Sequence, residues 1–353
     1  MSDAASRPMT RLDAFLALCN ARFREFYRES EVVFWSFIFP VVVAVGLGIA
    51  FRNRPVEVLS VAVVEGPEAE AVARTLAAAP ALQAKTMSAE DAARGLRMGR
   101  VALVVVPGRD AATYRLDPSR PESVLARARA DDALQRAAGR ADPLPTRAEE
   151  VHEPGARYID FLIPGIIGMN LMGGGMWGMG FNLVDMRIKR LLKRLIATPM
   201  RRGDFMLAQM ATRVLFMFVE VTFVLVFGHL AFGVPIRGSW LAIYGVGALG
   251  AFAFAGLGLL VACRAQRIEA VMGLMNVAMV PMWVCSGIFF SADRFPDAVQ
   301  PLIRALPLTA LNDALRAVIL EGASLAAQSR SLLVVGLWGL VSFVVGLRFF
   351  RWS

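Results

Sequence analysis

The stretch WLAIYGVGALGAFAFAGLGLLVAC, residues 240–263, decides the class of fold, because it carries no charged side chain and is long enough to cross a bilayer as one helix. Five further runs have a similar character, although one of them contains Glu220 and His229. The six apolar runs are residues 32–51, 161–184, 214–232, 240–263, 271–290 and 331–347. The sequence therefore predicts an α-helical polytopic membrane protein with six transmembrane helices.

The composition of the 353-residue chain agrees with that class. Apolar residues make up 56%, charged residues only 19%, and the mean hydropathy is +0.53. Soluble domains contain roughly 45–50% apolar residues and disordered chains are rich in charge, so both classes are excluded. Three cysteines lie far apart and only two histidines are present. We therefore expect no disulfide framework, no metal site and no cofactor bound by this chain.

The basic residues predict how the chain is oriented in the membrane. With the N-terminus inside, the segments expected in the cytoplasm hold 17 lysines and arginines, whereas the short outer loops hold five. Because cytoplasmic loops are enriched in Lys and Arg, both termini are predicted to be cytoplasmic, in a multi-pass protein of the cytoplasmic (inner) membrane. The net charge of +9 is then explained by topology and contact with membrane lipids, and nucleic acid is not an expected partner.

Residues 1–31 precede the first run and are expected to lie in the cytoplasm. Within them, residues 12–27 place apolar side chains at helical spacing, with arginines largely on the other faces. This pattern is typical of an amphipathic helix at the inner leaflet, or of a helix docked on the first span. A cleaved signal peptide is the alternative for residues 32–51, but the long polar segment before them favours an uncleaved helix.

Residues 52–157 separate the first two runs and predict a small extracytoplasmic α/β domain. They hold 16 basic and 15 acidic residues, so the insert is nearly neutral. Val-rich runs are typical of buried strands, and helical segments between two such runs predict a βαβ unit. Ser88 followed by Asp91 resembles a helix capping box. The expected strands are 56–64, 101–106 and 113–116, the helices 67–79, 88–97 and 121–138, and the linker 139–155.

The remaining residues, 158–353, are expected to form a five-helix transmembrane region. Its first run contains Gly173, Gly174, Gly175, Gly178 and Gly180. Small residues in a span let helices approach closely, so we interpret this cluster as a packing surface and not as a phosphate-binding loop. The chain has three lysines and none follows a glycine, so the GxxxxGK[ST] phosphate loop is absent from this sequence.

The most distinctive segment is DMRIKRLLKRLIATPMRR, residues 185–202. Its first part predicts a helix that continues from the second span, with an apolar stripe and a basic face, and Pro199 ends that helix. A basic face beside the membrane is typical of an anchor on anionic lipid. It is equally typical of a docking helix for a cytoplasmic partner.

Ionisable groups inside the predicted spans form a second group of candidates. Arg213 and Glu220 are seven residues apart, on one face of the third span, which predicts an ion pair near its cytoplasmic end. A charged residue within a span is also a candidate for substrate or gating contact. Asp160 and Glu269 lie at span edges, where we expect them to be solvated.

The segment after the fifth run predicts an irregular outer structure. Ser286 and Gly287, followed by several prolines, are expected to break the helix. Irregular backbone at membrane depth is tolerated only where protein or a water-filled cavity covers it. We therefore predict an outer gate or cap, with a wide turn as the alternative, and a re-entrant or amphipathic helix over 302–320. The candidate cap residues are Ser286, Gly287, Phe289, Phe290 and Pro307.

Together these features resemble the permease subunits of type-two ABC exporters, a family of drug-resistance, sodium, lipid and polysaccharide exporters. The residues that carry the resemblance are KRLIATPMRR at 193–202 and PMWVCSGIFF at 281–290, followed by Phe295-Pro296, Pro307-Leu308-Thr309 and Leu315-Arg316. The resemblance implies that 185–202 holds a coupling helix for an ATPase subunit, with 12–27 as the connecting helix beside it. The implied coupling residues are Asp185, Arg187, Lys193, Arg194, Thr198, Pro199 and Arg201.

The resemblance also implies partners and an activity. It implies a permease that is not itself an enzyme, paired with a second permease chain as a homodimer or heterodimer. ATP and Mg²⁺ would be bound by the ATPase partner. A membrane receptor or assembly scaffold with a ligand-binding outer domain is the alternative, but such a protein needs few spans. An ion-driven transporter would need buried charge in several spans, and only Glu220 is convincing.

Overall fold

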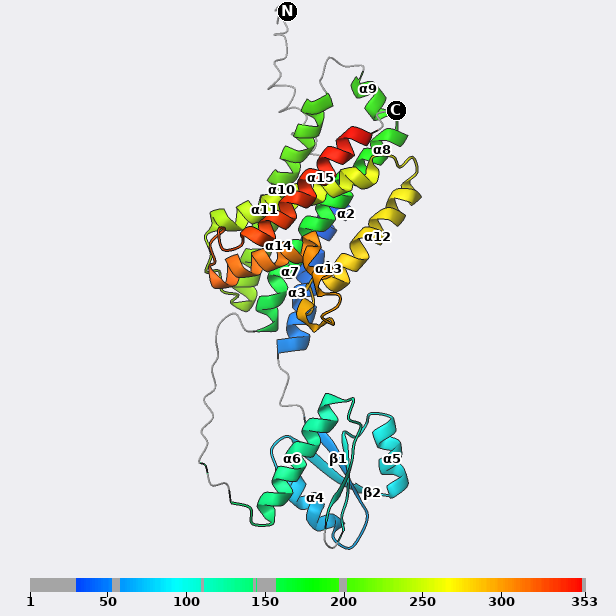
Figure 1. Ribbon diagram of the computed structural model, residues 1–353, viewed down its shortest axis with the longest axis vertical. Coiled ribbons are helices and arrows are strands. Elements are labelled where there is room, and N and C mark those ends of the chain that lie inside the picture. The colour runs from blue at the N-terminus through cyan, green and yellow to red at the C-terminus, as the bar shows by residue number, and fades with distance from the viewer. Residues whose placement is uncertain are drawn as a thin grey trace, which may run out of the picture. The chain divides into compact units, whose positions relative to one another are not determined.

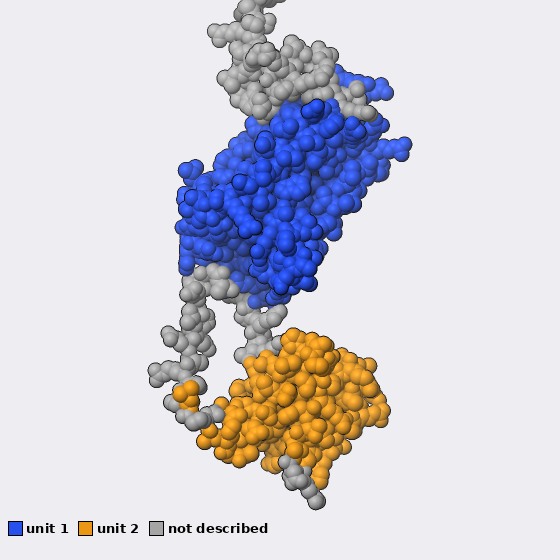
Figure 2. All heavy atoms as spheres, in the orientation of Figure 1, with its two compact units in different colours: residues 1–52, 152–353 blue, residues 53–151 orange. Residues whose placement is uncertain are grey.

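The computed structural model describes residues 30–52, 58–108, 111–141, 144, 157–196 and 202–350. The chain divides into two compact units, shown in Figure 2: unit 1 comprises Met1–Arg52 and His152–Ser353, and unit 2 comprises Asn53–Val151. The helix predicted over 12–27 lies outside the described residues.

Unit 1 contains six helices that are long and apolar enough to cross a membrane, among the residues described. They are Ser30–Phe51, Tyr158–Ile188, Ala208–Phe232, Trp240–Ala262, Ile268–Cys285 and Ser329–Phe349. Each overlaps one of the six runs expected from the sequence. The helical, polytopic class is therefore confirmed.

Two of these spans combine more than one helical segment (Figure 1). The first is α2 (Ser30–Val33), the π-helical η1 (Phe34–Ile38) and α3 (Phe39–Arg52). The second is α7 (Tyr158–Gly175), the π-helical η2 (Met176–Phe181) and α8 (Asn182–Ile188). The others are α10 (Arg202–Phe232), α11 (Trp240–Ala262), α12 (Ile268–Cys285) and α15 (Ser329–Phe349), and short helices join them: α9 (Leu191–Ile196), η3 (Ala292–Arg294), α13 (Gln300–Ala305), α14 (Pro307–Arg316) and η4 (Ala317–Glu321).

Two spans form the centre of unit 1. The second span and α11 are 78% and 67% buried, whereas the first span, α12 and α15 are at most 22% buried. The exposed faces of the outer helices are apolar, as lipid contact requires. The short helix α14 packs among α7, α11 and α15, so it belongs to the core of unit 1 although it does not span the membrane.

The structure corrects one expectation about the segment after the second span. We expected one continuous helix through residue 196, but α8 ends at Ile188 and Arg190 adopts a left-handed conformation with φ 56°. The helix resumes as α9 in a new direction. Every residue in this stretch tolerates a helix, so composition carried no sign of the break.

Unit 2 is a four-stranded sheet in the order β2-β1-β3-β4. Its strands are β1 (Leu59–Val64), β2 (Leu82–Met87), β3 (Leu103–Val106) and β4 (Thr113–Arg115), and its helices are α4 (Ala69–Ala78), α5 (Ala89–Arg97) and α6 (Pro121–Ala137). Strands β2 and β3 run parallel to β1, and β4 runs antiparallel to β3. The helices α4 and α6 cover one face of the sheet and α5 covers the other (Figure 1).

The core of unit 2 explains which strands the sequence revealed. Strand β1 is buried on both faces, with Val61 and Val63 in one core and Ala62 in the other. The edge strand β2 was missed, because only Leu82 in it is fully buried and the rest is mixed in polarity. The predicted cap of α5 is confirmed: the Asp91 N–H donates to Ser88 Oγ over 3.2 Å.

Candidate functional site

The C-terminal end of the second span, predicted to be cytoplasmic, is built around Arg187. Its guanidinium donates to the carbonyl oxygens of Ala262 (3.1 Å), Cys263 (3.4 Å) and Ala265. The same group lies 4.9 Å from the centre of the Phe350 ring. Arg187 therefore binds the end of α11 and the residue after α15, and it contacts its own chain where the sequence suggested contact with a partner.

The other predicted coupling residues lie beside this joint. Asp185 pairs with Lys189 over 2.8 Å, within α8 and the turn that follows it. Lys193 and Arg194 are exposed on α9, while Leu192 on the same short helix is buried. The short helix α9 therefore presents an exposed basic surface, and its Leu192 packs into the core of unit 1. Thr198, Pro199 and Arg201 lie outside the described residues, and the coupling role of the whole set stays a prediction.

The predicted ion pair in the third span is confirmed. Arg213 Nη1 and Nη2 donate to the two carboxylate oxygens of Glu220 over 2.9 and 2.8 Å. The Arg213 and Glu220 side chains are only 10% and 2% exposed. Arg213 lies near the start of the apolar span Ala208–Phe232 and Glu220 lies in its middle. Pairing removes the net charge that would otherwise be costly there.

The glycine cluster of the second span packs against neighbouring helices, as predicted, at three of its five positions. Gly174 faces the Arg213 guanidinium, Gly175 faces Phe254 of α11, and Gly180 faces the backbone of Gly258. Gly173 and Gly178 face open space instead. The second span therefore meets α10 and α11 through particular glycines and not along its whole length.

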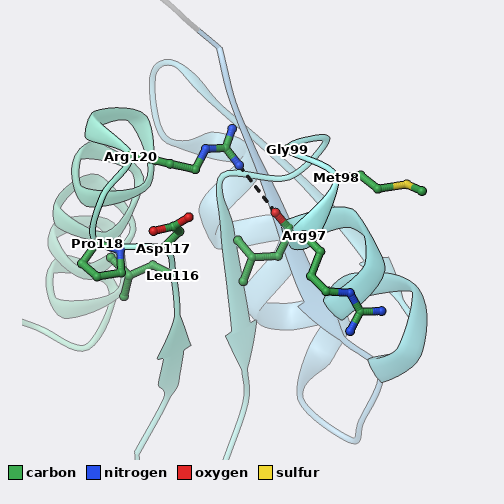
Figure 3. A pocket seen from close by; sticks show the side chains of 8 residues that line it. Arg97, Met98, Gly99, Leu116, Asp117, Pro118 and Arg120 are labelled. Carbon is green, nitrogen blue, oxygen red and sulfur yellow. Dashed lines mark hydrogen bonds between the residues drawn. The ribbon is translucent and has the colours of Figure 1, made fainter.

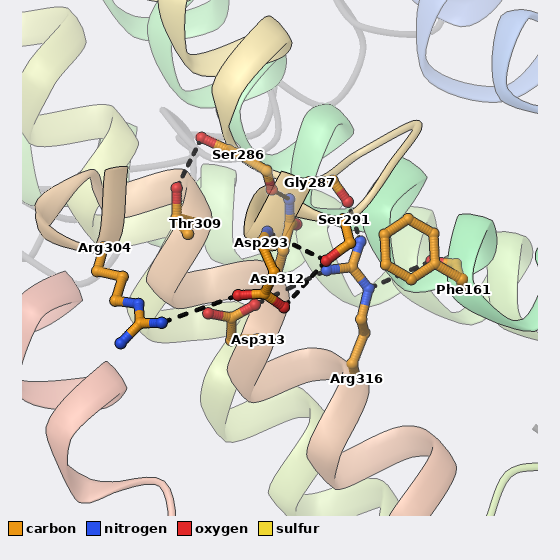
Figure 4. Close-up of polar contacts among 10 residues, drawn as sticks. All are labelled: Phe161, Ser286, Gly287, Ser291, Asp293, Arg304, Thr309, Asn312, Asp313 and Arg316. Atoms are coloured by element: carbon orange, nitrogen blue, oxygen red, sulfur yellow. Dashed lines mark hydrogen bonds and ion pairs between the residues drawn. The ribbon is translucent and has the colours of Figure 1, made fainter. Parts of the chain in front are cut away.

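The predicted outer cap is a compact polar cluster (Figure 4). Ser286 is buried at the end of α12, and its Oγ accepts a hydrogen bond from the Thr309 hydroxyl over 3.0 Å. The Asn312 amide donates to the Ser286 carbonyl over 2.9 Å. Gly287 has φ +68°, a conformation that favours glycine. The break after α12 is therefore held by side chains of α14.

Arg316 joins three elements of this cap. Its Nε donates to the Phe161 carbonyl over 3.3 Å, and its guanidinium lies 3.7 Å from the centre of the Phe161 ring. Another nitrogen of the same group donates to the Gly287 carbonyl. The start of α7, the end of α12 and the end of α14 are thereby held together, as Figure 4 shows.

The remaining cap candidates surround this cluster. The Tyr158 hydroxyl donates to the Phe289 carbonyl over 3.0 Å, the Phe290 ring lies 5.9 Å from that of Phe295, and Pro307 is buried at the start of α14. Sequence reasoning did not select Asn312 or Arg316 as site residues. Arg316 had two signals, its place in the Leu315-Arg316 motif and its charge within an otherwise apolar stretch, whereas Asn312 had only its polarity.

Asp160 corrects another expectation. We expected it to be solvated, but it is fully buried and pairs with Arg157 over 2.8 Å. The Arg157 guanidinium also donates to the carbonyls of Phe232 and Gly233, each over 3.0 Å. The start of α7 is thereby bonded to the end of α10. Glu269 is exposed, as expected.

Unit 2 has an open hollow of about 640 Å³ between the end of α5 and the turn before α6 (Figure 3). The Arg120 guanidinium donates to Glu122 over 2.7 Å and reaches the Leu96 carbonyl over 3.5 Å. Hydrogen bonds from Ser119 lower the pKa of Asp117. The charged groups Arg120 and Asp117 are therefore already engaged within the domain. No group of three or more potential metal ligands occurs among the described residues.

Six apolar helices with a buried ion pair, a polar cap and an α/β domain between the first two spans define a multi-pass helical membrane protein. More particularly, the chain belongs to the ABC-2 transporter family, because the family model described as ABC-2 family transporter protein matches residues 31–348.

Curated relatives carry names from the same class. The chain is 24% identical over 185 residues to ABC transporter G family member 20 of Dictyostelium discoideum. It is 25% identical over 189 residues to the probable multidrug ABC transporter permease YbhR of Escherichia coli (strain K12). Each match covers 52% of this chain, but only 25% of the Dictyostelium protein and 51% of YbhR.

Proposed function

We propose that this chain is the permease subunit of an ABC exporter of the cytoplasmic membrane. It moves a substrate outward with energy from ATP, which a separate ATPase subunit binds with Mg²⁺ and hydrolyses. Two permease chains pair to enclose the pathway. The observation that carries the proposal is the family match over residues 31–348. The match includes all six spans apart from the end residues Ser30 and Phe349.

One feature of the sequence supports a separate ATPase subunit. The chain contains no GxxxxGK[ST] loop, and its three lysines all lack a preceding glycine. The absence of this loop from these 353 residues supports a separate ATPase subunit. In the proposed complex that subunit binds ATP and Mg²⁺, and the permease binds, orients and moves the substrate.

The docking surface for that partner is the joint between α8 and α10. Lys193 and Arg194 are exposed on α9 and form a basic surface at the cytoplasmic end of unit 1, given the predicted orientation. Exposed charges of this kind steer and orient a partner of opposite charge. Arg187 stabilises the same joint by donating hydrogen bonds to the carbonyls at the end of α11.

Affinity purification of the tagged chain from native membranes tests the proposal. We expect an ABC ATPase subunit to be recovered with the permease, and we expect the complex to hydrolyse ATP. The double variant Lys193→Glu/Arg194→Glu should lose the ATPase subunit. The control, Arg348→Glu, changes an exposed arginine at the end of α15, outside the docking segment, and should retain the subunit. A folded chain that recovers no ATPase would overturn the proposal.

A further inference from the structure

Gly174 provides a notch in α7 that seats the Arg213 guanidinium of α10. A β-carbon built on Gly174 would lie 2.3 Å from Arg213 Cζ and 2.3–2.4 Å from its two terminal nitrogens. Such distances are far shorter than van der Waals contact, so the guanidinium can occupy this place only because residue 174 has no side chain.

The guanidinium has little freedom to move away from the notch. Both of its terminal nitrogens bond to Glu220, and its side chain is 10% exposed. A methyl group at position 174 would therefore displace the guanidinium only by distorting or breaking the ion pair. The two side chains are only 10% and 2% exposed, so little water is available to replace a lost bond.

The two helices joined at this notch bracket the predicted docking segment. The docking segment is the predicted coupling segment, residues 185–202: it begins within α8, which ends the second span at Ile188, and it reaches the start of α10 at Arg202. The same two spans are joined again at their other ends, where Arg157 donates to the carbonyls of Phe232 and Gly233. Two attachments at different heights restrict hinge motion between them.

We infer that Gly174 is a positioning residue of the transport cycle. By seating Arg213 and Glu220 against α7, it makes the second span and α10 move as one body when the docking segment is displaced. The inference rests on the proposed function, because the displacement comes from the ATPase partner. Gly174 lies in α7, outside the predicted docking segment, and faces Arg213, so its effect is transmitted through the ion pair.

The chain offers a matched control at the adjacent position. Gly173 and Gly174 are neighbours in one helix, but a β-carbon on Gly173 would meet nothing within 4 Å. Gly173→Ala and Gly174→Ala therefore change helix propensity equally and differ only in the notch. The experiment compares both variants as purified permease–ATPase complexes in lipid nanodiscs. It measures ATP turnover above that of the isolated ATPase subunit, the KM for ATP, the subunit ratio and the melting temperature.

For Gly174→Ala we expect the permease-dependent turnover to fall by about fivefold or more, the low end of typical coupling between distant sites. The KM for ATP and the subunit ratio should not change, because the nucleotide site and the docking surface are untouched. Gly173→Ala should behave as the wild type. In the background Arg213→Met/Glu220→Gln, which lacks the ion pair, adding Gly174→Ala should cause no further loss.

Three results would overturn the inference. They are equal turnover for the two alanine variants, an equal loss with and without the ion pair, and a loss that only follows a lower subunit ratio or melting temperature. If the neutral background does not fold, the series Ala, Ser and Val at position 174 should give graded losses, with a flat series at position 173. If purification of the wild-type chain recovers no ATPase subunit, the proposed function itself is refuted, before any variant is compared.

Discussion

At the scale of residues, charge is tolerated inside unit 1 where a partner cancels it. Glu220 lies at mid-span with Arg213, and Asp160 is buried beside Arg157. An unpaired charge at such depth is expensive, whereas a hydrogen-bonded pair is much less so. Breaking one partner of a buried pair leaves an uncompensated charge, so these residues act as units and cannot be exchanged singly.

Unit 2 offers a residue whose titration can be read without interference. Burial, followed by the hydrogen bond to Asp131 (3.1 Å), raises the pKa of Tyr114 to about 12. Tyr114 is the only tyrosine between residues 53 and 151, and no tryptophan lies there. The phenolate absorbance of isolated unit 2 therefore reports this one side chain.

We expect that titration midpoint to lie well above the pKa of free tyrosine, about 10. The folded pKa is raised, so the stability contributed by the neutral phenol is fully present below pH 10 and is lost as the pH rises towards about 12. Asp131→Asn should lower the midpoint, whereas Asp132→Asn should not, because Asp132 bonds to Arg136 and Arg140 instead. Equal midpoints for both variants would contradict the assignment.

At the scale of elements, the second span links the polar cluster around Ser286 to the joint between α8 and α10. Arg316 binds its start at Phe161, Arg213 rests on its middle at Gly174, and Arg187 at its end binds α11. A π-helical stretch, η2, lies between the last two contacts. Such stretches are frequent at functional sites, and here the stretch stands where α7 passes into α8.

The cap provides a prediction about stability. Replacing Arg316 by Met should leave the Phe161 and Gly287 carbonyls without their donor and remove the stacking on the Phe161 ring. We expect a loss of about 3 kcal/mol, since a buried acceptor left unpaired costs about 1–3 kcal/mol. The measurement is the thermal denaturation of the purified chain in detergent.

Arg304→Met is the matched control for Arg316. Arg304 is 60% exposed, and the Asp293 carboxylate with which it pairs lies 3.8 Å away. Exposed pairs of this kind contribute about 0–1 kcal/mol, so the melting temperature should hardly change. If both variants melt at the same temperature as the wild type, Arg316 does not hold the cap together.

At the scale of the whole molecule, charge and hydropathy define an orientation that reporter fusions can test. We expect alkaline phosphatase inserted after Gly139 to be active, because unit 2 is predicted outside the cytoplasm. A green fluorescent protein fused after Ser353 should fluoresce, because the C-terminus is predicted inside. The reverse pattern, with fluorescence at Gly139 and phosphatase activity at Ser353, would refute the orientation.

Local sequence predicted those parts of the fold that depend on local chemistry. The six spans follow from runs such as 240–263, where only a helix satisfies every backbone group in an apolar solvent. The Val-rich strands and the Ser88 cap were also found, because each depends on a few neighbouring residues. Strand β2 was missed because an edge strand needs few apolar residues, and the break at Arg190 because its residues all permit a helix.

The candidate site could be predicted only in part. The pair of Arg213 and Glu220 could be predicted, because a spacing of seven residues places both on one helix face. Arg187 could be selected as a basic residue, but its binding to the end of α11 could not, since those carbonyls lie about 75 residues further along the chain. A still larger separation, 155 residues, concealed the hydrogen bond from Arg316 to Phe161.

The sequence alone therefore determined that this protein is a multi-pass membrane protein of the ABC-2 family, because hydropathy and motif are properties of contiguous residues. Only the tertiary structure decided which groups meet across helices. It seated Arg213 on Gly174 and not on Gly173, and it buried Asp160 beside Arg157. The physical reason is that close packing depends on which faces of distant helices coincide, and no single helix carries that information.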